Sequence, residues 1–195
     1  LSEQMSQTLA QMGDLSVIQV NSPYAYSSSD DGIKLNDEAV SQMEAIEGVA
    51  AVSPKMSLDS DDTMFTLYAG TGDRYVCSWA TIVGMNASAL DSVGYEPIEG
   101  EQLKPSTSGM SKATTGAAID VLVGQWLAYN FSDTYRAEGS QYVDRYSYLY
   151  DWDGTGDMPD ESLAPDPFFD ILSVGNLTLA ALDSNGNEKM RFTLH

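Results

Sequence analysis

The segment LNDEAVSQMEAIEGVAAVSP, residues 35–54, constrains the fold more than any other part of the chain. Its apolar residues recur at three- and four-residue spacing, which predicts an amphipathic helix. Asn36 or Asp37 can cap the start of this helix, and Gly48 is expected to end it. The helical positions expected to face a core are Ala39, Val40, Met43 and Ile46.

Short apolar runs flank this helix on both sides. Val17–Val20 precedes it and Val49–Val52 follows it, so the order predicts strand, helix and strand, which is half of a βαβ layer. Further along, Met64–Gly70 and Thr81–Met85 are expected to form a pair of strands, with Thr71–Arg74 as the turn. The first half of the chain is therefore expected to combine one helix with several strands.

The second half has a regular start and a regular end around an unusual middle. The pattern around Val121–Phe131 hints at a second strand–helix unit, and residues 168–195 form a regular end of the chain. The intervening residues 132–167 hold five tyrosines, one tryptophan and nine acidic residues, a composition too aromatic for ordinary disorder. The Ser/Thr/Gly/Pro-rich residues 104–116 are expected to form a surface loop.

These segments, in this order, resemble a known family. The run GVAAVSP (48–54), the expected strands MFTLYAG (64–70) and TIVGM (81–85), and the segment GYEPIEGEQL (94–103) are similar to the extracytoplasmic core domain of MacB-type ABC transporter permeases, within the FtsX group. The segment 94–103 departs from the pattern, because glutamates flank its Gly100 where the family usually has arginine. Ile119–Phe131 looks like the strand and helix that follow in the family, and residues 168–195 look like its closing strands.

The resemblance implies an α+β fold with a mixed sheet. A βαβ-containing porter-like lobe would also take strands around Ile119–Val123 and Phe192–Leu194, and a second mixed α/β lobe would be inserted into it. The whole chain, residues 1–195, would be a single extracytoplasmic core domain. Lobe A would comprise approximately residues 14–58, 117–131 and 168–195, and lobe B approximately residues 59–116 and 132–167.

The resemblance also implies a function without catalysis. Such a domain couples the ATP-driven motion of membrane helices to substrate export or to an extracellular protein partner. ATP would bind a separate nucleotide-binding subunit, and the full transporter would be dimeric, although its isolated extracytoplasmic domain can be monomeric. The domain would lie at the cell surface or in the periplasm, anchored through flanking membrane helices.

Composition and missing motifs limit the other functional classes. The chain has 29 acidic and 9 basic residues and a net charge of −20, which argues against a nucleic-acid partner. This charge either keeps an exposed domain in solution or attracts cations such as Ca²⁺. The one histidine, His195, leaves no Ser-His-Asp site, and the sequence has no phosphate-binding P-loop. Cys77 lies in the apolar run YVCSWA, which predicts a buried, unreactive thiol.

The strongest candidate for a metal site is the segment DWDGTGD, residues 151–157. Its carboxylates stand beside glycines and could fold around a Ca²⁺ ion, although the spacing is a poor match to an EF-hand loop. The other interpretation is an ordinary acidic turn. The candidate ligands are Asp151, Asp153 and Asp157.

An aromatic cluster precedes and overlaps this segment. Its rings would fill a core or would form an exposed surface for a partner or ligand. The alternative function is therefore a secreted or surface-attached binding module that recognises a peptide or glycan through residues 142–157, with or without Ca²⁺. A hydrolase that uses carboxylates is a third hypothesis, for which no pair of acids stands out. The cluster consists of Tyr142, Tyr146, Tyr148, Tyr150 and Trp152.

Overall fold

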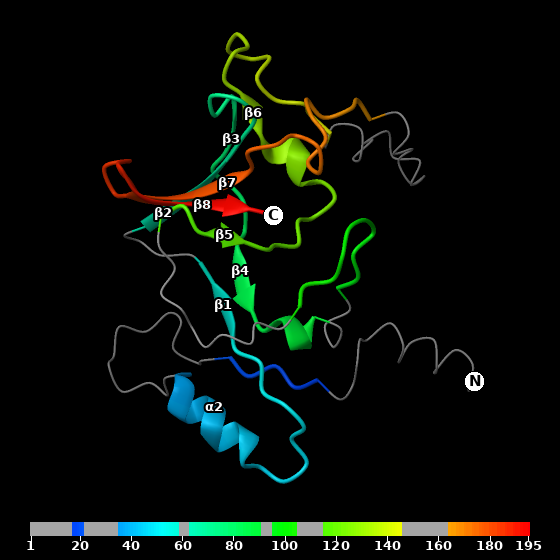
Figure 1. Ribbon diagram of the computed structural model, residues 1–195, viewed down its shortest axis with the longest axis vertical. Coiled ribbons are helices and arrows are strands. Elements are labelled where there is room, and N and C mark those ends of the chain that lie inside the picture. Colours follow the sequence, from blue (N-terminus) through cyan, green and yellow to red (C-terminus); the bar gives the residue numbers. More distant parts are fainter. Residues whose placement is uncertain (1–16, 22–34, 59–62, 91–94, 105–114, 146–163) are drawn as a thin grey trace, which may run out of the picture. The chain divides into compact units, whose positions relative to one another are not determined.

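The fold is α+β with a mixed sheet, as expected, and the chain divides into two compact units (Figure 1). Unit 1 comprises residues 1–56 and 83–109, and unit 2 comprises residues 57–82 and 110–195. The computed structural model describes residues 17–21, 35–58, 63–90, 95–104, 115–145 and 164–195.

Unit 2 contains a six-stranded sheet in the order β5-β8-β7-β2-β3-β6 (Figure 1). The pairing of β5 with β8 is parallel, and the other four pairings are antiparallel. The two edge strands are the shortest, which limits the backbone exposed for pairing with another chain. The strands are β2 (Thr63–Ala69), β3 (Tyr75–Cys77), β5 (Ala118–Ile119), β6 (Ser132–Asp133), β7 (Thr178–Asp183) and β8 (Glu188–Leu194).

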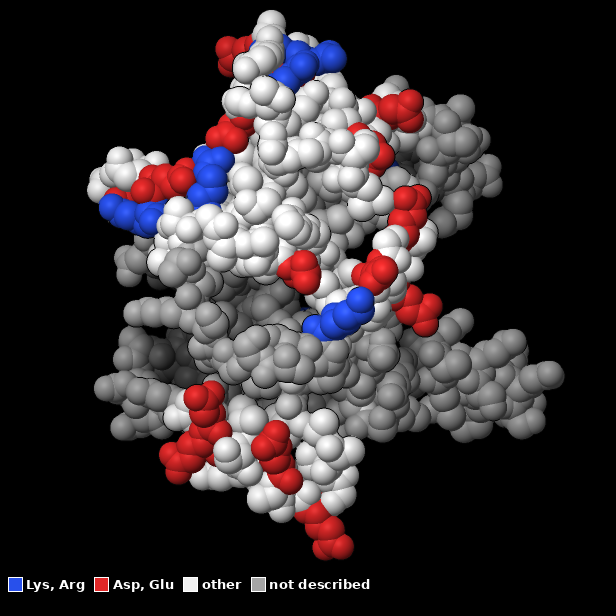
Figure 2. Space-filling view, viewed as in Figure 1, with Lys and Arg blue, Asp and Glu red and all other residues white. Residues whose placement is uncertain are grey.

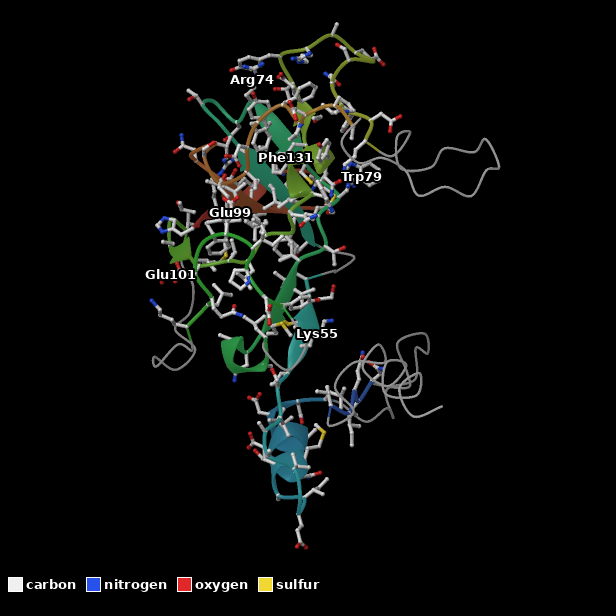
Figure 3. The ribbon with its side chains drawn as sticks, turned by 90° about the vertical axis from the view of Figure 1, so that its right-hand side faces the viewer. Lys55, Arg74, Trp79, Glu99, Glu101 and Phe131 are labelled. Atoms are coloured by element: carbon white, nitrogen blue, oxygen red, sulfur yellow. The ribbon has the colours of Figure 1, made fainter. Side chains whose placement is uncertain are left out.

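A row of side chains across four strands forms the core of unit 2. Leu67 in β2 lies opposite Cys77 on one side and Leu179 on the other, and Leu179 lies opposite Phe192. These four residues are buried together with Phe131, which precedes β6 (Figure 3). Strand alternation sends every second side chain to one face, so the registers bring these apolar residues together. The expected burial of the Cys77 thiol is confirmed.

The turn expected at Thr71–Arg74 is confirmed, but it joins a different pair of strands. Strand β2 pairs across it with β3, which begins immediately after the turn. The segment Thr81–Met85 instead contains β4 (Val83–Met85), which pairs with β1 (Lys55–Ser57) in a separate two-stranded sheet. The nearest chain after a tight turn is the natural antiparallel partner, and the sequence pattern did not mark β3 as a strand.

In unit 1, helix α2 (Asp37–Glu44) lies inside the expected segment. The side chain of Asn36 caps it by accepting a hydrogen bond of 3.1 Å from the backbone N–H of Ala39. The helix ends four residues before Gly48, because Ile46 N–H bonds to the carbonyl of Met43 and tightens the last turn. Gly48, with φ +92°, lies in the turn that follows the helix.

The expected strands on either side of this helix are not formed. Val17–Val20 and Val49–Val52 have no strand partner in the described chain, and Ile18 remains 85% exposed. An apolar run becomes a strand only where a neighbouring backbone accepts its hydrogen bonds. The prediction of a βαβ layer from residues 17–52 is therefore wrong.

The segment Ile119–Phe131 is less regular than predicted. Its strand β5 ends at Ile119, and its helical part is the short 3₁₀ turn Leu127–Asn130, entered through a hydrogen bond from Leu127 N–H to the carbonyl of Gly124. The closing strands are confirmed as β7 and β8. A second 3₁₀ turn, Ala87–Ala89, follows β4.

The strand pairings join segments that were expected in different lobes. Strand β2 was expected in lobe B (59–116) and strand β7 in lobe A (168–195), yet these strands pair over six residues from Thr63 to Tyr68. The final hairpin, formed by β7 and β8, joins the sheet through β7, which lies beside β2. The sheet therefore unites segments that the resemblance separates.

Candidate functional site

Most of the site residues predicted from the sequence lie outside the described residues. This holds for the candidate calcium ligands Asp151, Asp153 and Asp157 and for four members of the aromatic cluster, Tyr146, Tyr148, Tyr150 and Trp152. Tyr142 is described and is 57% exposed. Within the described ranges, no group of three or more His, Cys, Asp and Glu residues could hold a metal ion.

The described residues instead bring together an arginine cluster at the tip of the β2–β3 hairpin. The tip is formed by Gly70, Thr71, Gly72 and Asp73, and Arg74 follows it immediately before β3 (Figure 3). Gly70 has φ +77°, and a Cβ there would lie 3.0 Å from the Tyr75 ring, so glycine permits both the turn and the close approach of that ring.

Asp133 is the fixed point of this cluster. It is 0% exposed, and its carboxylate accepts hydrogen bonds from Arg74 Nε at 2.9 Å and Arg74 Nη2 at 2.6 Å. It also accepts bonds from Arg136 Nε at 3.2 Å and from the backbone N–H of Tyr135 at 3.0 Å. A buried carboxylate is tolerated only when its oxygens are satisfied, and here four donors satisfy them.

These contacts change the acid–base properties of the cluster. Hydrogen bonds from Arg74 lower the pKa of Asp133 to about 2, against an ordinary value of 3.8, although burial acts in the opposite direction. The same bonds raise the pKa of Arg74. Asp133 therefore stays ionised at neutral pH and serves as an anchor for two arginines.

Two tyrosines flank the Arg74 guanidinium. Its central carbon lies 5.1 Å from the centre of the Tyr75 ring and 5.3 Å from that of Tyr135, within cation–π range. Tyr75 in turn packs on Phe169, with ring centres 4.4 Å apart. The guanidinium is thus held by the Asp133 carboxylate and by aromatic faces.

A cavity of about 440 Å³ opens beside this guanidinium, entirely within unit 2. We call it the Arg74 pocket. It is open to solvent, and its wall combines a cation, hydroxyl groups, aromatic rings and an apolar side chain. It is lined by Gly70, Thr71, Arg74 and Tyr75 from the hairpin, and by Tyr135, Phe169 and Val174.

A second arginine supports the same hairpin from β8. Arg191 Nη1 lies 2.8 Å from Asp73 in the tip, and its Nη2 lies 2.7 Å from Glu188. Its guanidinium also lies over the ring of Tyr68, 4.5 Å from the ring centre. Figure 2 shows basic side chains beside acidic ones at the β7–β8 hairpin. In α2, by contrast, every charged side chain is acidic.

Sequence reasoning missed the Arg74 pocket. The polar turn at Thr71–Arg74 was identified, but Asp133 is 59 residues away from Arg74 and belongs to a segment singled out for other reasons. One signal in the sequence was available, namely the small number of basic residues. The whole chain has only nine of them, so an arginine in a tight turn stands out. That signal does not identify the partner.

Comparisons with protein-family models, characterised proteins and solved structures found no match for this chain. A search of the described residues for a helix long and apolar enough to cross a bilayer found none.

Proposed function

We propose that this chain is a non-catalytic extracytoplasmic domain of an ABC transporter permease of the MacB type. In this role it couples ATP-driven motion of membrane helices to substrate export or to an extracellular partner. A separate subunit binds and hydrolyses the ATP, and the complete transporter is a dimer. The domain lies outside the cytoplasm and is anchored by membrane helices in the flanking sequence.

The division of the chain into two compact units is the observation that carries this proposal. The chain passes from one unit to the other three times, at residues 56/57, 82/83 and 109/110. Mechanical coupling needs compact bodies joined at a few points, because force applied to one body must reach another without unfolding either. The packed row of Leu67, Cys77, Leu179 and Phe192 gives unit 2 the required internal cohesion.

The order of the family-like segments gives further support. Strand β2 overlaps the first of the two segments that the resemblance marks as strands, β4 lies within the second, and β7 and β8 lie within the closing segment. The helix before GVAAVSP is also present as α2. The missing strands at residues 17–20 and 49–52 count against the porter-like lobe, so the proposal rests on segment order and on the two units.

Sequencing the gene outward from both ends of this chain tests the proposal. We expect one apolar span of about 20 residues shortly before Leu1 and three beyond His195, next to a gene for an ATP-binding subunit. Flanks with no such span would contradict the proposal. A cleavable signal peptide without membrane spans would instead support a secreted binding module.

A further inference from the structure

We propose that the Arg74 pocket binds a carboxylate that is attached to an apolar group. The source of such a ligand is either a small organic acid or the C-terminus of a peptide that ends in an apolar residue. This inference is independent of the proposed transport role, because it rests on side chains of unit 2 alone.

The free edge of the Arg74 guanidinium supplies the carboxylate recognition. Asp133 occupies the Nε–Nη2 edge with two hydrogen bonds, at 2.9 and 2.6 Å. No described residue accepts a hydrogen bond from Nη1, and Arg74 lines the cavity with its side chain 38% exposed. A guanidinium held on one edge can still bind a second carboxylate through its Nη1–Nη2 edge, in the bidentate geometry that arginine favours.

The cluster holds this edge in place before any ligand arrives. Two ring faces, from Tyr75 and Tyr135, flank the guanidinium, and the buried Asp133 carboxylate fixes its orientation. A long arginine side chain ordinarily loses rotamer freedom on binding, so pre-ordering removes part of that cost. The sequence uses the small residues Gly70 and Gly72 at the tip, which keeps the approach open beside the rings.

The charge next to the pocket favours a ligand with one negative charge. Arg74 and Arg136 share the single carboxylate of Asp133, so this group carries one positive charge in excess. Asp73 and Glu188 share Arg191 on the same hairpin, so that group carries one negative charge in excess and would repel an anion of higher charge. A monocarboxylate matches the single positive charge beside the pocket.

The remaining wall suits an apolar group next to the carboxylate. Phe169 and Val174 line the cavity, and Phe169 packs against Tyr75. The depression is open to solvent, and its volume of about 440 Å³ is large enough for one terminal side chain. Thr71 adds a hydroxyl to the same wall.

Titration of the ¹⁵N-labelled protein with N-acetyl-phenylalanine, followed by NMR, tests the inference. We expect shifts of the Arg74 Nε–H and Thr71 amide signals, and binding at least about tenfold weaker for N-acetyl-phenylalaninamide, which lacks the carboxylate. Equal binding of the acid and the amide, or shifts confined to other parts of the protein, would overturn it.

Two variants and a matched control make this test specific. Arg74→Gln should weaken binding of the acid at least about tenfold, whereas Lys189→Gln, which removes one exposed positive charge outside the pocket, should leave it nearly unchanged. Equal losses in both variants would attribute binding to net charge and contradict the proposal. If Arg74→Gln perturbs the fold, Val174→Trp fills the cavity while it keeps the ion pairs, and undiminished binding in that variant would overturn the proposal.

A peptide ending in phenylalanine and its amidated form distinguish the two sources. Carboxylate-dependent binding of the peptide as tight as that of the single residue supports a peptide C-terminus. Binding of the small acid with exclusion of the peptide supports a small organic acid. If neither carboxylate binds, the inference is wrong, and the proposed transport role is unaffected.

Discussion

Unit 2 buries a continuous row of large apolar side chains, whereas the described part of unit 1 leaves most of its large apolar side chains exposed. Phe131 and Cys77 in unit 2 are each 1% exposed, but Ile46 is 57% and Ile98 is 77% exposed in unit 1. Leu90 is the one buried side chain among the described residues of unit 1. The difference does not come from a lack of apolar residues in unit 1, since Val17–Val20 and Val49–Val52 are as apolar as β7.

The difference in burial comes from the number of neighbouring strands in each unit. In unit 2 each central strand has a neighbour on both sides, so one row of apolar side chains continues across the sheet. In unit 1 the helix cap, the local turns and a short two-stranded sheet satisfy the backbone without creating such a row. An apolar pattern therefore becomes a core only where long-range pairing supplies an opposite face.

The largest expected effect is the loss of a core ring from unit 2. Phe131→Ala should lower the free energy of unfolding by about 3–5 kcal/mol, because it leaves a cavity beside Phe169, whose ring packs edge-on at 5.2 Å. The matched change in unit 1, Ile46→Ala, should cost less than about 0.5 kcal/mol. Urea denaturation followed by the NMR amide signals of each unit measures both values, and equal costs would refute the contrast between the units.

Removal of the buried charge should have the next largest effect. Asp133→Asn should destabilise the protein by about 2–3 kcal/mol, because two arginines lose their ionised acceptor. The exposed control Glu138→Gln should change stability by less than about 0.5 kcal/mol.

Asp133 should also make the stability of the protein depend on pH. Because the folded state depresses the pKa of Asp133 from 3.8 to about 2, its contribution is fully present above about pH 4 and is lost as the pH falls toward 2. Asp133→Asn should therefore remove part of the acid destabilisation of the wild-type protein. Identical acid-denaturation profiles for the two proteins would show that Asp133 does not stabilise the hairpin through its charge.

A pair of glycine variants separates backbone strain from steric contact. Gly70 and Gly186 both have positive φ, but an added Cβ meets the Tyr75 ring only in Gly70→Ala. We expect costs of about 2 kcal/mol for Gly70→Ala and about 1 kcal/mol for Gly186→Ala. Equal melting temperatures would show that the ring moves away freely and does not fix the wall of the Arg74 pocket.

The smallest effect should be local to unit 1. Asn36→Ala removes the cap of α2 at a cost of about 1 kcal/mol, so the Ala39 amide should exchange with solvent roughly fivefold faster. Ser41→Ala also removes a polar side chain from this region, but it does not cap, and it should leave the exchange unchanged or slower. Hydrogen exchange followed by NMR measures both, and equal acceleration would argue against capping.

Local signals in the sequence predicted part of this molecule. The Asn36 cap, the strand β2, the turn after it and the closing strands follow from patterns within about ten residues. The pairing of β2 with β7, more than a hundred residues apart, does not, and neither does the contact between Arg74 and Asp133. Long-range partners decide whether an apolar run is a strand, which is why Val17–Val20 misled the prediction.

For the candidate sites, too, the sequence revealed local patterns and missed long-range contacts. Aspartates at close spacing and alternating tyrosines suggested sites because their patterns are local, and all of these residues except Tyr142 lie outside the described chain. The Arg74 pocket is assembled from the β2–β3 hairpin and from residues near 135 and 170. A site of this kind has no local pattern, since each contributing segment has an ordinary composition.

The most direct test of the coupling role is a distance measurement between the units in the complete transporter. Spin labels at Gln42 in unit 1 and Ser184 in unit 2 would report their separation by pulsed electron resonance, and labels at Ala137 and Ser184 would serve as a control pair within unit 2. Cys77 can remain, because at 1% exposure its thiol is shielded from the labelling reagent. Our account predicts that trapping the ATP-bound state shifts the distance between the units and leaves the control distance unchanged. Identical distributions for the Gln42–Ser184 pair with and without ATP would contradict it.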